Sequence, residues 1–328
     1  MDVGLLAKGM TWVYKVGSLR LRSDQFVAAR NDGLLPLRTA PTTIRGTTMV
    51  EIKDVVVFVD GRREGSGFIE FAARLAQEHG AHLTGAFVWP PLANEGSAAY
   101  VRGRAMEELI ASYDAEVSRH EKTLRDSFEK AASGGGLQTE WRSVRHLVAE
   151  DMVVHARYAD LAIVGRPESV SLDAIPLDLP QTLVLASGRP VLLLPPEPPR
   201  SAGRRVLVGW NAGREATRAV ADALPFLERA EAVELLVVDH QSHPANHGEE
   251  PGADIARHLA RHGVRVDVRR MASGGEEVGR TIFSRASAFG ADLVVMGAYG
   301  HSRLTELVFG GVTRTALHEA KLPVLMSR

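Results

Sequence analysis

The sequence contains no cysteine among its 328 residues. That absence excludes disulfide scaffolds, thiolate zinc sites and thiol nucleophiles, and it is typical of proteins in a reducing compartment. An excess of charge of one sign is also missing, because 39 Lys and Arg residues balance 40 Asp and Glu residues. Without a basic excess, no chain-wide electrostatic field favours nucleic acid, and we expect no nucleic-acid partner.

Long apolar runs are absent as well. The longest ones, such as Leu161–Gly165 and Val191–Leu194, are far too short to span a bilayer. We therefore expect a cytoplasmic protein without membrane contact. Residues 1–48 lack both sustained periodicity and the apolar core of a secretory signal. Because Met49 directly precedes a typical first strand, we expect residues 1–48 to be a disordered arm or the product of a start codon assigned too early.

What the sequence does contain is an internal repeat. Ala159–Gly165 matches Ala291–Gly297, and Arg189–Leu194 matches Leu322–Met326. Such a repeat is the signature of one structural unit used twice. Between the copies lies the proline-rich segment Pro195–Ser201, which can continue neither a helix nor a central strand. We predict a first domain at 49–196, a linker at 197–204 and a second domain at 205–328.

Within each half, apolar strands alternate with amphipathic helices. Val278, Ile282, Ala286 and Phe289 fall on one helical face, and Gly290 then ends that helix. The following strand, 293–296, is apolar throughout, as a strand covered on both faces must be. Alternating strands and helices predict an α/β fold with two tandem, doubly wound parallel-sheet domains of Rossmann-like type. Such sheets bind ligands at the carboxyl ends of their strands.

A glycine-rich loop follows that strand in the second half. Gly297 and Gly300 let the backbone approach a ligand closely, and nine residues separate Gly300 from Gly310. The next helix begins near Gly310, where free backbone N–H groups and the helix dipole favour an anion. Side-chain donors are also present at Ser302, Arg303 and Thr313. The simpler alternative is that these glycines only form turns.

The glycine pattern, the preceding strand 294–297 and the closing segment 323–325 resemble the universal stress protein family. Both halves resemble it, over about residues 50–328, so the chain is similar to its tandem members. The resemblance implies that the loop holds the phosphates and ribose of ATP, accompanied by Mg²⁺, and that strand ends frame the adenine. It also implies that the last strands of the two halves pair. When the family's nucleotide-contact positions are matched to this sequence, the implied contacts are Asn211, Val238, Met296, Gly297, Gly300, Ser302, Arg303, Gly310, Gly311, Val312 and Thr313.

Two residues of the second half depart from the family pattern. Asn211 replaces the usual Asp, and Gly311 stands where Ser or Thr is usual, so one charge and one hydroxyl are missing. Backbone N–H groups supply much of a phosphate site, so we expect weakened binding. In the first half no glycine loop follows Gly165, and Glu168 and two prolines stand there instead. We expect that half to bind no nucleotide and to serve a structural role.

Two other patterns suggest different chemistry. Residues 274–281 spell a P-loop with Arg280 in place of its lysine, but Glu276 and Glu277 would repel phosphate there. His240, His243 and His247 crowd one polar loop, although without the regular spacing of metal ligands. We predict no metal site and no catalytic residue.

These observations favour a stress-response regulator that binds an adenine nucleotide in its second half and works as a sensor rather than as a turnover enzyme. Its partners would be the nucleotide, an unidentified protein and a second copy in a homodimer. Two alternatives stay open: an interaction module whose nucleotide site has decayed, and a slow ATPase.

Overall fold

The computed structural model describes residues 51–60, 65–89, 103–134, 136–145, 149–166, 179–242, 250–299 and 311–328. Its strands form one ten-stranded sheet in the order β3-β2-β1-β4-β5-β10-β9-β6-β7-β8. They are β1 (Asp54–Asp60), β2 (His82–Trp89), β3 (Thr139–Arg145), β4 (Leu161–Gly165), β5 (Val191–Leu194), β6 (Arg205–Gly209), β7 (Ala232–Val238), β8 (Val266–Met271), β9 (Leu293–Gly297) and β10 (Val324–Ser327).

The two halves meet at the centre of this sheet. All pairings within each half are parallel, whereas β5 pairs antiparallel with β10, with Val324 opposite Leu193 and Met326 opposite Val191. The doubly wound α/β fold is therefore confirmed, and so is the pairing of the two last strands within one chain. The predicted boundaries at 196 and 205 fall between β5 and β6. They stay a prediction, because Thr47–Arg328 forms one compact unit.

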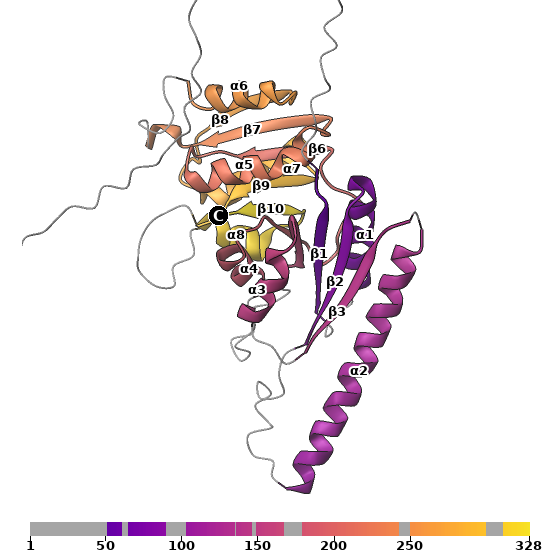
Figure 1. The fold of residues 1–328 in the computed structure, drawn as a ribbon. Coiled ribbons are helices and arrows are strands. Elements are labelled where there is room, and N and C mark those ends of the chain that lie inside the picture. Colours follow the sequence, from indigo (N-terminus) through magenta and orange to yellow (C-terminus); the bar gives the residue numbers. More distant parts are fainter. Residues whose placement is uncertain are drawn as a thin grey trace, which may run out of the picture. The chain divides into compact units, whose positions relative to one another are not determined.

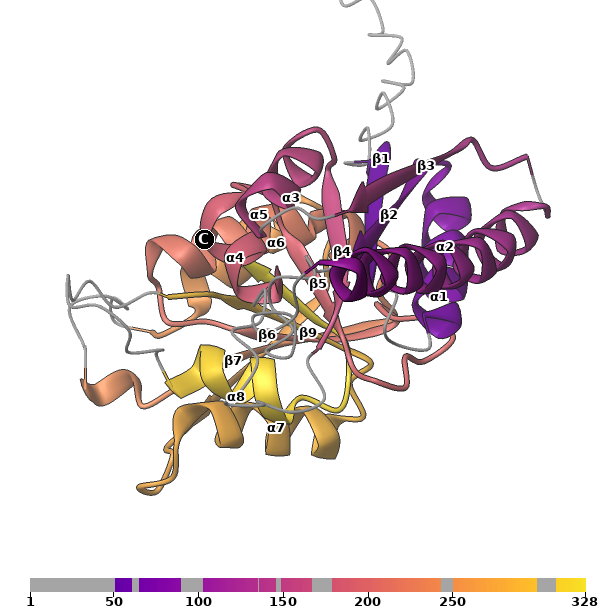
Figure 2. The same cartoon turned by 90° about the horizontal axis from the view of Figure 1, so that it is seen from below.

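Helices cover both faces of the sheet (Figures 1 and 2). α1, α2, α5 and α6 share one apolar cluster, and α3, α4, α7 and α8 share the cluster on the opposite face. None of the helices in the described ranges is long and apolar enough to cross a membrane. The helices are α1 (Ser66–His79), α2 (Arg104–Ala132), α3 (Ala149–Arg157), α4 (Leu179–Ala186), α5 (Arg214–Leu227), the 3-10 turn η3 (His240–Ser242), α6 (Ala253–Arg261), α7 (Val278–Phe289) and α8 (Gly311–Glu319).

Local patterns explain most of these elements. In α7 the residues Ile282 and Ala286 are buried on one face, and Gly290 ends the helix with a φ of 68°. That left-handed conformation favours glycine, so the predicted helix end is confirmed. The central strands β4 and β9 are buried almost throughout, as predicted for strands covered on both faces.

From the sequence, residues 206–211 and residues 264–268 are each predicted to form a strand, and both predictions need correction. The strand expected at 206–211 ends at Gly209, because the chain leaves the sheet after Trp210 to enter α5. The strand expected at 264–268 is β8, which runs from Val266 to Met271. Gly263 has a φ of 78° and turns the chain there, so Val264 precedes the strand. β8 is an edge strand of alternating burial, and edge strands carry a weaker apolar signal than central ones.

Side chains also join the halves. Arg166, directly after β4, donates through Nη1 to the backbone oxygen of His318 near the end of α8. On the opposite face, Nη1 of Arg229 lies 2.9 Å from Nδ1 of His79 at the end of α1. These contacts add to the pairing of β5 with β10, which joins the two halves into one sheet.

Candidate nucleotide site at the carboxyl edge of the second half

The strands of the second half end at one edge of the sheet. The chain runs from β6 to β7 and β8 on one side, and then crosses to β9 on the other side of β6. The edge between β6 and β9 is thus a topological switch point, where doubly wound folds bind ligands. The turns that leave β6, β7 and β9 at this edge contain Asn211, Asp239 and Tyr299.

Asn211 is exposed and shapes the turn into α5. Its Oδ1 accepts a hydrogen bond from the backbone N–H of Gly213 over 2.9 Å, and Ala212 between them has a φ of 56°. The acceptor oxygen of the amide is therefore engaged by its own turn. A ligand would meet the Nδ2 donor, whereas the aspartate usual in the family would offer a second carboxylate oxygen.

Gly297 is explained by helix packing. A Cβ at this position would lie 2.5 Å from the backbone nitrogen of Ala216 and 2.8 Å from Cβ of Glu215, in the first turn of α5. No side chain fits there, so β9 and α5 can approach closely only at a glycine. This contact accounts for the residue without a ligand, as the simpler interpretation proposed, although it leaves the backbone beside the switch point.

Thr313 ties the first turn of α8 to the end of β9. The backbone N–H of Tyr299 donates to its Oγ1 over 3.2 Å, and the threonine is only 3% exposed. Tyr299 has a φ of 61°, an unusual conformation for an aromatic residue that this hydrogen bond stabilises. The two ends of the predicted loop are therefore side by side. Gly300, Ser302, Arg303 and Gly310 lie outside the described residues.

The apolar side of the predicted site is a single cluster. Met296 is buried, and Val238, Tyr299 and Val312 are half-buried against the same cluster under α7 and α8. Val238, Met296 and Val312 thus belong to the apolar layer that covers this face of the sheet in both halves, and their shared contact with a ligand stays a prediction. An apolar wall of this kind suits a planar base.

Gly311, at the beginning of α8, lies against a carboxylate. A Cβ at this position would collide with Oε1 of Glu277, the residue before α7. The N-terminus of α8 carries partial positive charge and attracts anions. A resident negative charge is therefore present where the sequence predicts phosphate. In the sequence Glu277 stands out only within the apparent P-loop, because nothing local links it to Gly311, 34 positions away.

Two further acidic residues lie at this edge, and neither was predicted as a nucleotide contact. Glu215, in the first turn of α5, is 7% exposed and accepts from Nη2 of Arg214 over 3.0 Å. Asp239, directly after β7, accepts from the backbone N–H of Ser273 over 2.8 Å, and hydrogen bonds from the side chain and the backbone of Ser273 lower the pKa of its carboxyl group. An acid in the first turn of a helix is a usable sequence signal for Glu215.

The other predicted patterns have a structural setting. Within the described ranges, no group of three or more His, Asp or Glu side chains is arranged to hold a metal ion. His240 lies in η3, while His243 and His247 lie outside the described residues. In the first half, a Cβ at Gly165 would lie 2.9 Å from the ring of Phe68, so this glycine too is explained by packing.

Comparison with known proteins places this site in a family. Residues 203–328 match the family model described as the universal stress protein family. No curated protein matches the chain. A universal stress protein structure from Archaeoglobus fulgidus DSM 4304 superposes with a TM-score of 0.62 at 14% identity, covering 83% of this chain and 96% of that one. A structure from Pseudomonas aeruginosa UCBPP-PA14, described as a candidate member of the same family, gives 0.55 at 14% identity, covering 84% and 93%.

At this level of identity the two structures show a shared fold, and their coverage extends that fold over both halves. The family match is carried by the half that contains β9, α8 and the predicted glycine loop. Residues 203–328 therefore form a domain of the universal stress protein family, and the first half shares the fold of the two structures.

Proposed function

We propose that the second half binds an adenine nucleotide, ATP with Mg²⁺, between the end of β9 and the N-terminus of α8, and that the protein acts as a stress-response sensor. The observation that carries this proposal is the hydrogen bond from Tyr299 to Thr313, which brings the strand end and the helix N-terminus to one place. Backbone N–H groups at such a junction are suited to phosphate. The base would lie on Val238, Met296 and Val312.

A sensor is favoured over an enzyme because the described part of the site contains no arrangement for activating water. The carboxylate of Glu215 is paired with Arg214, that of Asp239 accepts from a backbone N–H group, and that of Glu277 lies at the N-terminus of α8. Ligand binding would instead stabilise one arrangement of α8 relative to β9, and a protein partner or a second copy would read the changed surface.

A second candidate function has its own support. The carboxylate of Glu277 beside Gly311 and the uncharged Asn211 are both unfavourable for a strong phosphate site. They favour an interaction module whose nucleotide site has decayed. The two functions differ in one measurable property, the affinity for ATP.

Calorimetry on the full chain tests the proposal, with ATP and with adenosine, each with and without Mg²⁺. We expect ATP binding, and we expect Thr313→Val to weaken it because the junction loses its hydrogen bond. Thr315→Val is the matched control: Thr315 lies two residues further along α8, and its hydroxyl donates within the helix to the oxygen of Gly311. No heat of ATP binding in the wild type would support the decayed module. Steady phosphate release at saturating ATP would support the ATPase.

A further inference from the structure

The ten-stranded sheet has two edges, β3 in the first half and β8 in the second. Each edge strand has one neighbouring strand, so the backbone groups on its outer side can pair with a further strand. At β3, Leu83 of β2 lies opposite Thr139, and its N–H donates to the oxygen of Gln138 over 2.9 Å. In this parallel pair the backbone groups of Thr139 and Trp141 therefore face outward. These outward groups make no hydrogen bond with any other residue that the structure describes.

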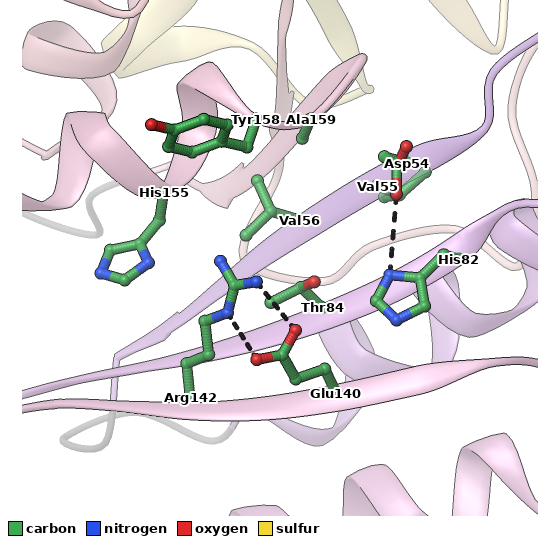
Figure 3. Close-up of a pocket in the computed structure, with 10 residues that line it drawn as sticks. All are labelled: Asp54, Val55, Val56, His82, Thr84, Glu140, Arg142, His155, Tyr158 and Ala159. Carbon is green, nitrogen blue, oxygen red and sulfur yellow. Dashed lines mark hydrogen bonds and ion pairs between the residues drawn. The ribbon is translucent and has the colours of Figure 1, made fainter.

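The side chains of β3 alternate between the two faces of the sheet. Trp141 lies under α2, with its ring centre 5.2 Å from that of Phe128 and its Nε1 donating to Glu121 over 3.3 Å. Glu140 and Arg142 lie on the opposite face, where Nε and Nη2 of the arginine donate to the carboxylate over 2.9 and 2.8 Å (Figure 3). Their side chains are 47% and 34% exposed. An accessible acid and an accessible base thus flank one half-buried tryptophan.

This order of residues is self-complementary. When a second copy pairs antiparallel about a twofold axis at Trp141, Trp141 lies opposite its own copy and Glu140 lies opposite Arg142 on both sides of the axis. The outward backbone groups then face one another. A shift to the next register in which these groups still meet places Glu140 opposite Glu140 or Arg142 opposite Arg142, and like charges that lie directly opposite destabilise a strand pair. The charges therefore select one register, and the Glu140–Arg142 pair of each copy can stay intact in it.

The other edge of the sheet has the same pattern within an excess of positive charge. Residues 267–269 of β8 repeat the order of an acid, an apolar residue and an arginine found at 140–142 of β3, and both ranges pair with corresponding positions of the neighbouring strand. Four further arginines are exposed on β8, directly before it and on α6: Arg257, Arg261, Arg265 and Arg270. A second copy at this edge would bring these arginines together, and like charges of this kind prevent the pairing of edge strands. Beside Trp141, by contrast, one acid balances one arginine.

The helix α2 enlarges the surface beside β3. Because it packs on both β2 and β3 (Figure 1), pairing of two β3 strands also brings two α2 helices together on one face of the joined sheet. The exposed charges of α2 are of both signs, as in the hydrogen bond from Nε of Arg125 to Glu129 over 3.0 Å. Specific interfaces bury about 1,200–2,000 Å² in total, which a strand and a helix from each copy supply more readily than a strand edge alone.

We propose that two copies of the chain form a symmetric dimer in which the β3 strands pair antiparallel about Trp141 and the two sheets continue as one. The partner is thus a second copy of this chain, recognised by backbone hydrogen bonds around Trp141 and by the opposition of Glu140 and Arg142. The exposed part of the Trp141 ring is covered by the same ring of the second copy. This inference does not depend on nucleotide binding, because β3 belongs to the first half and the proposed nucleotide site to the second.

Sedimentation equilibrium of the full chain tests the pairing through exchanged charges. We expect the wild type to form a dimer, and we expect Glu140→Arg and Arg142→Glu each to raise its dissociation constant at least about tenfold, because each variant places like charges opposite one another on both sides of the axis. An equimolar mixture of the two variants should regain the wild-type affinity, since the introduced arginine of one then faces the introduced glutamate of the other. A variant that merely disturbed the fold would gain nothing from mixing.

Asp267→Arg is the matched control, since it makes the same change at the repeat position of Glu140 on the other edge, and it is expected to associate as the wild type. A monomeric wild type, a dimer that neither variant weakens, or a mixture that stays dissociated would each overturn the proposal. Loss of association in Asp267→Arg would overturn it in favour of β8. Should the variants not fold, hydrogen exchange of the wild type decides. The amide of Trp141 is expected to exchange more slowly at high protein concentration than at low, and equal rates would overturn the pairing.

Discussion

Replacing Asp292 with alanine is expected to destabilise the protein more than replacing its repeat partner Asp160. The carboxylate of Asp292 accepts from the backbone N–H groups of Gly203, Arg204 and Arg205 over 3.0, 3.1 and 2.9 Å. It therefore holds the chain at the point where β6 begins. A matching carboxylate holds the beginning of β1.

Asp160 makes fewer of these bonds. It accepts from the backbone N–H groups of Lys53 and Asp54 over 2.8 and 3.1 Å. Both aspartates are half-buried, so water replaces part of what is lost, and we assign about 1 kcal/mol to each bond. The expected loss of stability is then about 3 kcal/mol for Asp292→Ala and about 2 kcal/mol for Asp160→Ala.

Asparagine variants sharpen the comparison. Both bonds of Asp160 reach the single oxygen Oδ2, so the amide oxygen of Asp160→Asn can accept both. Asp292 uses both oxygens, Oδ1 for Gly203 and Arg205 and Oδ2 for Arg204. In Asp292→Asn the amide NH₂ group replaces one of these oxygens. It is itself a donor, so it cannot accept from the backbone N–H group that it faces. We expect Asp292→Asn to cost clearly more than Asp160→Asn.

Urea denaturation at constant pH measures these differences, provided that the slope of the transition stays the same in all variants. Hydrogen exchange of the amides of β6 and β1 gives a local readout of each site. An Asp292→Ala variant that loses no more stability than Asp160→Ala would refute this prediction. Equal stability of the two asparagine variants would refute it as well.

Three further predictions concern charges. Glu277→Gln should strengthen ATP binding a few-fold and leave adenosine binding unchanged, since a charge at a helix N-terminus contributes about 0.3–1 kcal/mol. Equal gains for both ligands in calorimetry would contradict the proposed place of the phosphates. Arg166→Ala should lower the urea midpoint by removing the hydrogen bond to His318, a loss of about 1 kcal/mol; an unchanged midpoint would show that this contact does not join the halves. Burial and the charge of Arg229 lower the pKa of His79 from 6.5 to about 4. Because the unfolded chain takes up that proton first, stability should fall as the pH drops from 6.5 towards 4, by up to ~1.4 kcal/mol per pH unit. Denaturation series of wild type and His79→Gln check this, and an identical pH dependence of the two proteins would exclude His79 as its source.

The sequence by itself determined the repeated architecture. Central strands such as β4 and β9 are buried on both faces, so their segments are continuously apolar and recognisable without any partner. The end of α7 was equally readable, because Gly290 adopts the left-handed conformation that ends helices. The antiparallel pairing of β5 with β10 followed from the family resemblance, and not from any local pattern.

The candidate site has two sources in the sequence. The family resemblance implied Met296 and Val312 as nucleotide contacts, and Thr313 followed from the helix N-terminus that comes after the glycine loop; all three contacts stay predictions. The structure adds that Thr313 bonds to Tyr299. The predicted contacts at Gly300 and Gly310 stay predictions.

Only the tertiary structure decided which charges face one another. Glu277 reaches Gly311 because α7 packs beside α8, and Glu234 meets Arg285 because α7 crosses the sheet there. Local sequence encodes the periodic burial of single elements. Contacts between side chains of separate elements depend on how those elements pack, and the periodicity of the sequence does not determine that packing.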